Sequence, residues 1–416
     1  MNKTLLFYSD CAFFAGCENM LANFFNDTQF TDTYDILFIY RWTQAYEEGF
    51  QKRVFGDIDH IPLRLHDHYD LYNSVDKFRN RYLRKAIKIG INILMIKYIF
   101  LILNTIMLYR TIRNRHIDMV HINNGGYPGA YGTISMVIAA RLGGIRHVVY
   151  VVNNIAVGYR SPERWLDYPF DRIVVRMVSV FITGSNYAGN TLRKILRIPP
   201  EKILSIPNGI AKRTVTETRE QIIARLHIPG DRPLLSVIAV LDERKGQIFL
   251  LQALSEIKKS HPPIMPYCVI EGKGPTEALL RKFTCEHDLE DDILFVRNEP
   301  QIFNLINASD CIILPSIRNE DFPNIILESM SLGKAVIASN ISGIPEQLDH
   351  MRSGILTEPQ DIHGLVAAIR LISEDAALRN TLGKNAKMKF DEFYTDKKAI
   401  KQYCKIYTKL DTEVSP

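Results

Sequence analysis

Two glutamates in the second half of the chain have the residue type and spacing to bind an oxygen-rich ligand. They lie in the segment Leu314-Pro-Ser-Ile-Arg-Asn-Glu320-Asp-Phe-Pro-Asn-Ile-Ile-Leu-Glu328-Ser-Met-Ser-Leu-Gly333. This order of residues predicts a strand, a loop, a helix and a glycine cap at the end of the helix. Pro323 suits the first turn of that helix, because an N–H group there would have no intrahelical partner in any case.

The start of this helix has the character of an anion site. The residues at the helix start are Phe322, Pro323, Asn324 and Ile325. Backbone N–H groups at the positive end of a helix favour a phosphate or another oxygen-rich group. Glu320 lies just ahead of the helix and Glu328 follows about two turns later, so both carboxylates can face one ligand. Two glutamates at this spacing also occur by chance, and the alternative is a solvated loop residue and a helix-surface residue.

The elements that position this segment alternate along the chain. Apolar runs rich in β-branched residues predict strands at 4–8, 35–40, 118–123, 147–153, 179–184, 203–206, 234–241, 267–271, 293–296, 310–315 and 335–339. Helical patterns between them, such as 247–259 and 276–286, indicate parallel sheets covered on both faces. The predicted fold class is α/β, with two doubly wound, Rossmann-like domains that bind ligands at the carboxyl ends of their strands.

The domain boundaries follow from breaks in this pattern. We expect a first domain at 1–208 and a second at 209–394, and a C-terminal helix within 395–416 that packs back on the first domain. The 416 residues are 46% hydrophobic and 23% charged, which excludes a disordered chain, a fibre and a multi-span membrane protein. Six cysteines without a Cys-x-x-Cys pair indicate reduced thiols and not a disulfide framework.

Positive charge is concentrated between residues 77 and 117, where there are ten Lys or Arg and no Asp or Glu. Within this basic patch, 86–108 is apolar but interrupted by Lys88 and Lys97, which favours a core or interfacial helix over a membrane span. We expect a peripheral contact with an anionic membrane. A span and a plain solvated face are the alternatives. No nucleic-acid partner is expected, because the aromatic residues of the patch fit a helix core.

Several segments in chain order carry a resemblance to a known family. They are Phe14-Ala-Gly16-Cys-Glu18, Asp118-Met-Val-His-Ile-Asn, Thr183-Gly-Ser185, Ile206-Pro-Asn208-Gly209, Glu243-Arg244-Lys245-Gly246, Glu271-Gly272-Lys-Gly274-Pro, Glu320-x7-Glu328 and Gly343-Ile-Pro-Glu346. Together they resemble the retaining nucleotide-sugar glycosyltransferases of glycosyltransferase family 4. The resemblance covers about 1–395 and implies the GT-B fold, in which two Rossmann-like domains face a cleft. It also implies that 1–208 is the acceptor-side domain and 209–394 the nucleotide-sugar domain.

The resemblance implies roles for the matching residues. Glu320 and Lys245 would be catalytic: Glu320 would bind donor-sugar hydroxyls and stabilise positive charge at the anomeric carbon, and Lys245 would stabilise the leaving diphosphate. The implied donor-binding residues are Gly16, Asn208, Arg244, Gly274, Arg297, Phe322, Pro323, Asn324, Ile325 and Glu328. The implied acceptor-side residues are His121 and Asn153. No metal and no cofactor is expected besides the nucleotide-sugar donor.

The chain departs from the family before the Lys-Gly site. The family usually has a Gly-Arg pair there, but here the strand ends Ile238-Ala-Val240-Leu241 without an arginine, and Arg244 is a possible substitute. A satisfied core histidine is the alternative for His121.

A dense polar cluster lies at 57–70. Its spacing of His and Asp matches neither a helical zinc pair nor a zinc finger, so a metal site, an acceptor-side loop and a plain polar loop stay open.

The function expected from these features is the transfer of a hexose-type sugar, with retention, from a nucleotide-sugar donor to a glycan or lipid-linked acceptor. The setting is envelope polysaccharide or lipopolysaccharide assembly, in the cytoplasm and peripheral to the inner face of the cell membrane. The alternatives are a GT-B sugar-nucleotide epimerase or phosphorylase, and a non-catalytic GT-B partner subunit.

Overall fold

The structure is a computed structural model that describes residues 2–14, 16–93 and 95–412. The chain divides into two compact units. Unit 1 comprises Met1–Ile206 and Ile400–Pro416, and unit 2 comprises Pro207–Ala399. The division falls beside the predicted domain boundary at 208/209, and the C-terminal residues group with the first unit.

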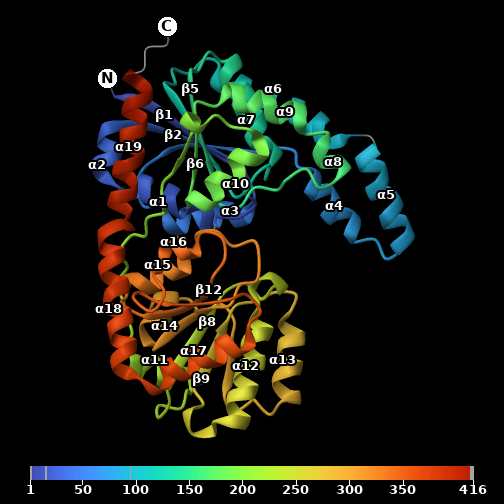
Figure 1. The fold of residues 1–416 in the computed structure, drawn as a ribbon. Coiled ribbons are helices and arrows are strands. Elements are labelled where there is room, and N and C mark those ends of the chain that lie inside the picture. The colour runs from blue at the N-terminus through green and yellow to red at the C-terminus, as the bar shows by residue number, and fades with distance from the viewer. Residues whose placement is uncertain (1, 15, 94, 413–416) are drawn as a thin grey trace. The chain divides into compact units, whose positions relative to one another are not determined.

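Unit 1 is built on a parallel sheet of seven strands among the described residues, in the order β3-β2-β1-β4-β5-β6-β7 (Figure 1). The strands are β1 (Lys3–Ser9), β2 (Tyr34–Arg41), β3 (Asp59–Leu63), β4 (Met119–Asn124), β5 (His147–Val152), β6 (Val180–Thr183) and β7 (Ile203–Ser205). The strand order reverses between β1 and β4. Ligands of open α/β sheets bind beside such a reversal, at the carboxyl ends of the strands.

The helices of unit 1 connect and cover these strands. They are η1 (Gly16–Glu18), α1 (Asn19–Asn26), α2 (Thr28–Thr33), α3 (Gln44–Arg53), α4 (His68–Asp76), α5 (Arg81–Ile93), α6 (Ile96–Ile112), α7 (Tyr131–Leu142), α8 (Pro162–Trp165), α9 (Tyr168–Met177), α10 (Asn186–Leu196) and η2 (Pro200–Lys202). The last helix of the chain, α19 (Asp396–Thr412), adds Tyr403 and Tyr407 to the aromatic core of this unit.

Unit 2 is built on a second parallel sheet, in the order β10-β9-β8-β11-β12-β13. The strands are β8 (Leu234–Ile238), β9 (Tyr267–Glu271), β10 (Ile293–Val296), β11 (Cys311–Leu314), β12 (Ala335–Ser339) and β13 (Ile355–Thr357). Its helices are α11 (Arg219–Leu226), η3 (Glu243–Lys245), α12 (Gln247–Ser260), η4 (Pro262–Ile264), α13 (Glu277–Glu286), α14 (Ile302–Ala308), α15 (Asn324–Ser331), α16 (Ile344–Gln347), α17 (Ile362–Glu374) and α18 (Ala376–Phe393). Here the order reverses between β8 and β11.

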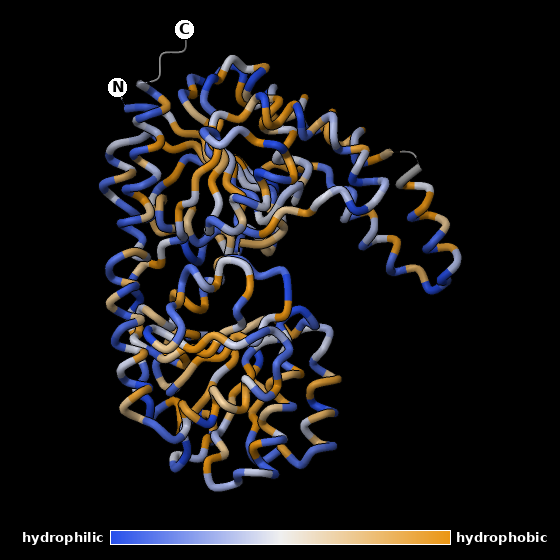
Figure 2. The backbone as a smooth tube through the Cα atoms, in the orientation of Figure 1, coloured by the Kyte–Doolittle hydropathy of each residue, from blue (hydrophilic) through white to orange (hydrophobic). Residues whose placement is uncertain are grey.

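Two parallel sheets with covering helices confirm the predicted α/β fold class. All of the predicted strands are present, but β3 and β13 were not predicted. Both lie at sheet edges, β3 has the exposed sequence Asp-His-Ile-Pro-Leu, and β13 spans three residues. Neither has the apolar run of a buried strand. The central strands do have it: Leu6, Val120 and Val148 are fully buried, and the strands of both sheets are largely hydrophobic in Figure 2.

The apolar stretch at 86–108 forms parts of two helices. Helix α5 ends at Ile93, and Met95, with a left-handed backbone at φ of +52°, is the N-cap residue of α6. In Figure 1, α5 extends away from the sheet of unit 1. No single helix of the described residues is long and apolar enough to cross a membrane. The helical segments Arg81–Ile91 and Ile96–Ile112 reach the length and apolar composition of a membrane span only when they are taken together, and they are bent by 54° relative to each other. The segment 77–117, which contains α5 and α6 and is called the helical arm below, exposes several large apolar side chains: Phe78, Tyr82, Leu83, Ile89, Met95, Ile99, Ile102, Leu103 and Ile106.

Candidate functional site

The two predicted catalytic residues of unit 2 lie in the loops that flank the reversal of strand order. Lys245 ends η3, in the loop after β8, and Glu320 lies in the loop between β11 and α15. Because β8 and β11 are parallel neighbours, both loops leave the sheet at the same edge. The topology therefore brings together residues that are 75 positions apart in the sequence.

Lys245 and Glu320 form an ion pair between Nζ and Oε2, and each side chain is only 11% exposed. The same Oε2 accepts a hydrogen bond from the Ser316 hydroxyl at 3.1 Å. A second cation reaches this carboxylate: Nη1 of Arg244 lies 3.6 Å from Oε2 and donates to the carbonyl oxygen of Asn319 at 3.1 Å. Arg244 therefore points toward the loop of Glu320, beside Lys245, and the structure places two cations at one carboxylate.

Gly246 allows the two loops to pack closely. It has φ of +68°, and a Cβ atom there would lie 2.1 Å from the carbonyl oxygen of Pro315. The backbone N–H of Ile317 donates to the carbonyl oxygen of Arg244 at 2.8 Å and joins the loops directly. A residue with a side chain at position 246 would push Lys245 away from Glu320.

The turn after β9 packs against the loop after β8. A Cβ atom at Gly272, which has φ of +140°, would lie 2.0 Å from the carbonyl oxygen of Ala239, and one at Gly274 would lie 2.2 Å from that of Leu241. Both glycines thus serve backbone-to-backbone contact. Val240, in the segment after β8 where the family usually has a Gly-Arg pair, is 56% exposed.

Helix α15 begins one residue later than predicted. Pro323 is the N-cap residue and not the first helical residue, with Asn324 next. Its carbonyl oxygen accepts hydrogen bonds from the backbone N–H of Ile326 and from the side chain of Gln347, each at 3.2 Å. Phe322 is buried, and its ring lies 5.7 Å from that of Tyr394.

The face of α15 that carries Glu328 also carries Asn324, one turn earlier. The side chain of Asn208 donates to Oδ1 of Asn324 at 3.4 Å, so two predicted donor-binding residues are in contact. Glu328 is half-buried on the same helix, next to the fully buried Leu327. At the other end Gly333, with φ of +66°, caps the helix as predicted: its N–H donates to the carbonyl of Met330 at 3.0 Å.

Arg297 pairs with a different carboxylate, that of Glu277. Its Nη2 atom lies 2.8 Å from Oε1 of Glu277, which also pairs with Arg281 at 2.9 Å. The Arg297 side chain is 62% exposed. Its role in donor binding stays a prediction.

The glycine loop of unit 1 follows β1 and starts η1 at Gly16; Ala15 lies outside the described residues. Glu18 of this turn is buried and accepts hydrogen bonds from Ser9 at 3.2 Å and from Asn123 at 3.3 Å. Asn153 donates to the side-chain oxygen of Asn123 at 2.8 Å. Asn153 therefore lies at the carboxyl edge of the sheet, joined to the glycine loop through the side chain of Asn123.

His121 is a core residue, which corrects its predicted place on the acceptor side. It is 2% exposed, its Nδ1 lies 2.7 Å from the hydroxyl of Tyr407, and its ring packs 4.7 Å from that of Phe7. Burial lowers the pKa of His121 to about 3, so the ring is neutral at physiological pH. A buried neutral imidazole bonded to α19 is not available to a substrate.

The polar cluster at 57–70 is occupied by structural contacts. Asp67 caps α4 and pairs with Arg41 at 2.8 Å, and Asp70 pairs with the same arginine at 2.6 Å. Within the described part of the chain, no group of three or more His, Cys, Asp and Glu side chains is arranged to hold a metal ion.

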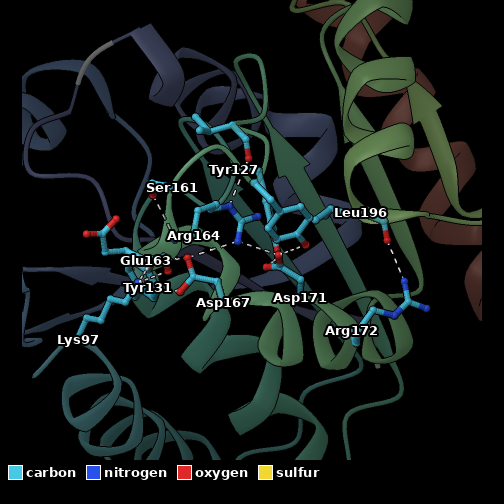
Figure 3. Close-up of polar contacts among 12 residues, drawn as sticks. Lys97, Tyr127, Tyr131, Ser161, Glu163, Arg164, Asp167, Asp171, Arg172 and Leu196 are labelled. Atoms are coloured by element: carbon cyan, nitrogen blue, oxygen red, sulfur yellow. Dashed lines mark hydrogen bonds and ion pairs between the residues drawn. The ribbon is translucent and has the colours of Figure 1, made fainter. Parts of the chain in front are cut away.

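Unit 1 contains a buried charge network whose residues the sequence pattern did not mark as functional (Figure 3). Arg164 lies between Asp171, at 2.8 Å, and Asp167, at 3.3 Å. Asp167 also pairs with Lys97 of α6 at 2.9 Å and accepts from the Tyr131 hydroxyl at 2.8 Å. The network joins the starts of α6, α7 and α9, and its signal in the sequence is only the presence of charged residues beside apolar runs.

Comparison with known proteins identifies glycosyltransferases as relatives of this chain. The model "Glycosyl transferases group 1" matches residues 218–389, and the model "Glycosyltransferase Family 4" matches residues 64–212. A UDP-Gal:alpha-D-GlcNAc-diphosphoundecaprenol alpha-1,3-galactosyltransferase of Escherichia coli is 26% identical over 68% of this chain and 73% of its own length. The amylovoran biosynthesis glycosyltransferase AmsK of Erwinia amylovora is 30% identical over 42% of this chain, and the match covers 44% of the length of AmsK. The crystal structure of Anabaena HepE in complex with UDP-glucose superposes with a TM-score of 0.73 at 18% identity, over 98% of this chain and 99% of HepE.

Proposed function

Because the chain belongs to the family 4 type of glycosyltransferases and has the GT-B fold, we propose that it transfers a hexose from a nucleotide-sugar donor to a glycan or lipid-linked acceptor, with retention. The observation that carries the proposal is the contact of Lys245 and Arg244 with Glu320 at the reversal of strand order in unit 2. Two cations and a carboxylate there match a donor with a diphosphate at one end and sugar hydroxyls at the other.

The donor is bound by unit 2 in this proposal. Lys245 and the N-terminus of α15 stabilise the negative charge that develops on the leaving diphosphate. Arg244 supplies the second cation, which the family usually has in the Gly-Arg pair before the Lys-Gly site. Glu320 binds the sugar, and Glu328 accepts hydrogen bonds from the ribose. The acceptor hydroxyl attacks the anomeric carbon on the face of the leaving phosphate, which receives the hydroxyl proton. This arrangement supplies the charge stabilisation without a metal ion. HepE with UDP-glucose and the galactosyltransferase that uses UDP-Gal make UDP-hexoses the first donors to test.

The proposed acceptor rests on the named relatives and on the helical arm, and not on the residues of unit 2. The relative named for GlcNAc-diphosphoundecaprenol suggests a sugar linked to a lipid diphosphate, and AmsK suggests polysaccharide assembly. The helical arm combines ten cations in 77–117 with exposed apolar residues such as Tyr82 and Ile102, a combination that suits an anionic membrane surface. We therefore propose that the enzyme works in the cytoplasm, peripheral to the inner face of the cell membrane.

The experiment that tests the donor half is a thermal-shift screen with UDP, GDP, ADP and their hexoses, followed by a hydrolysis assay on each binder. A bound donor raises the melting temperature by mass action. No stabilisation and no hydrolysis with any nucleotide sugar would refute the proposal. Turnover of the nucleotide sugar without an acceptor to a new sugar nucleotide would indicate an epimerase instead.

A further inference from the structure

Asp10 occupies the position in unit 1 that corresponds to a ligand site, directly after β1 and beside the reversal of strand order between β1 and β4. It is 6% exposed, and its Oδ1 atom is buried without a hydrogen-bond partner among the described residues. The hydroxyl of Tyr8, at the end of the same strand, is buried without a partner as well. Buried polar atoms are nearly always paired in native proteins, so two such atoms at a strand end call for a ligand or a water molecule.

The start of α7 encloses this pair. A Cβ atom on Gly132 would lie 2.2 Å from Oδ2 of Asp10 and 2.8 Å from the Tyr8 hydroxyl, so only glycine lets the first turn of this helix approach both. The preceding residue, Tyr131, is held by its hydrogen bond to Asp167 in the buried network (Figure 3). The helix start is therefore fixed beside Asp10 by the contact of Tyr131 with Asp167, and the backbone of Gly132 also hydrogen-bonds to the Asp10 carboxyl.

The charges around Asp10 are unbalanced. Arg41 is the cation next to it, and this arginine already pairs with Asp67 and Asp70. Burial raises the pKa of Asp10 to about 7; Arg41 opposes this shift, while Asp67 and Asp70 add to it. The other titratable groups that face it are the hydroxyls of Tyr8 and of Tyr150 on β5. Asp10 is thus a buried carboxyl whose charge is only partly offset by Arg41 and by the backbone hydrogen bond from Gly132.

We infer that Asp10 and Tyr8 bind a hydroxyl group of the acceptor sugar at the carboxyl end of β1, an inference that rests on the proposed function. A carboxyl oxygen accepts a hydrogen bond, and a phenol hydroxyl both donates and accepts. Together they match a sugar hydroxyl, which also donates and accepts, better than a phosphate, which would be repelled by Asp10, Asp67 and Asp70. The site selects the sugar part of the acceptor, and the lipid part is left to other surfaces of the chain.

Asp171 supplies the matched comparison within unit 1. It is fully buried like Asp10, but its oxygens bond to Arg164, Tyr127 and Tyr159. Its network satisfies it completely, so it has no capacity left for a ligand. Substitution of Asp171 should affect folding stability and leave the affinity for the acceptor unchanged.

The test is steady-state kinetics of the full chain with UDP-galactose and GlcNAc-diphosphoundecaprenol in detergent micelles, for wild type, Asp10→Asn, Tyr8→Phe and Asp171→Asn. We expect Asp10→Asn to raise KM for the lipid-linked sugar at least tenfold, because the charge-assisted hydrogen bond is lost. The dissociation constant of UDP, measured by titration calorimetry, should stay within twofold. Tyr8→Phe should raise the acceptor KM by a smaller factor, and Asp171→Asn should lower the melting temperature without changing the acceptor KM.

The pH profile separates binding from a structural role. In wild type the kcat/KM for the acceptor should rise with pH to a plateau above pH 7, and this rise should be absent in Asp10→Asn. An unchanged acceptor KM and pH profile in a folded Asp10→Asn variant that binds UDP would overturn the inference and leave an internal water as the partner. A wild-type protein that binds UDP but transfers to no lipid-linked sugar would overturn it together with the acceptor half of the proposed function, whereas failure to bind any nucleotide would refute the donor half.

Discussion

The ammonium of Lys245 and the carboxylate of Glu320 form an ion pair at the carboxyl edge of the unit 2 sheet, with Arg244 3.6 Å from the same oxygen. The pair aligns the group proposed to stabilise the leaving diphosphate with the group proposed to bind the sugar. A diphosphate bound there would compete with Glu320 for Lys245, and the released carboxylate would be free to accept hydrogen bonds from the donor sugar.

Glu320→Gln should reduce transfer by at least a hundredfold and leave the fold intact. The amide keeps the shape of the side chain but removes the negative charge that stabilises positive charge at the anomeric carbon. The measurement is the rate of nucleoside diphosphate release with an acceptor present. Glu286→Gln, at an exposed carboxylate of α13, is the control and should behave as wild type. Retained activity in Glu320→Gln would disprove the assigned role.

Gly246→Ala should lower both stability and donor affinity. The added Cβ would meet the carbonyl oxygen of Pro315 at 2.1 Å in a left-handed backbone, so the loop of Lys245 must move. We expect a loss of about 1–3 kcal/mol in the free energy of unfolding, measured by urea titration. Gly230→Ala, where a Cβ would meet nothing within 4 Å, is the control. Equal effects of the two variants would contradict the packing argument.

His121→Phe should change how stability depends on pH. The folded-state pKa of about 3 lies below the ordinary value of 6.5, so the stability contributed by the neutral ring is present above pH 6.5 and is lost as the pH falls from 6.5 toward 3. Over that window wild type should lose up to about 1.4 kcal/mol per pH unit relative to His121→Phe. Urea unfolding at pH 7.5, 5.5 and 4.5 measures this difference. A constant difference across these values would mean that His121 is not buried as a neutral ring.

Replacement of apolar residues on the helical arm should weaken membrane binding. Ile99 and Ile102 of α6 are 50% and 58% exposed, and their change to Asn removes apolar area that a bilayer would cover. Co-sedimentation with vesicles of phosphatidylglycerol and phosphatidylethanolamine should show several-fold weaker binding, and salt should weaken the wild type too. Leu142→Asn, at a residue of α7 that is 62% exposed, is the matched control. If the arm variant binds as tightly as wild type, the arm is not the membrane surface.

The sequence predicted what depends on local pattern. Buried strands such as β5 and β12 are continuous apolar runs, and the loop–helix–glycine order around Glu320 and Gly333 has a local physical reason. It did not predict the edge strands β3 and β13, which lack such runs.

Residue surroundings that depend on distant segments were beyond the sequence pattern. The apolar pattern of a strand does not predict which helix packs over His121, because its hydrogen-bond partner Tyr407 is 286 residues away in the sequence. For the same reason the direction of Arg244 stayed open until the structure placed it beside Glu320. Asp10 directly follows β1, so the rule that ligands bind at the carboxyl ends of parallel strands applies to it. No sequence motif around Asp10 singled it out.

Whether Lys245 of unit 2 binds the donor diphosphate can be measured in the reaction of wild type and Lys245→Met with UDP-glucose, UDP-galactose and UDP-N-acetylglucosamine in the presence of GlcNAc-diphosphoundecaprenol. We expect wild type to release UDP and form an α-linked product from at least one of these donors, and Lys245→Met to bind UDP at least tenfold more weakly and form no product. A wild-type protein that neither binds nor cleaves any of them, or a Lys245→Met variant with wild-type affinity and rate, would contradict this expectation.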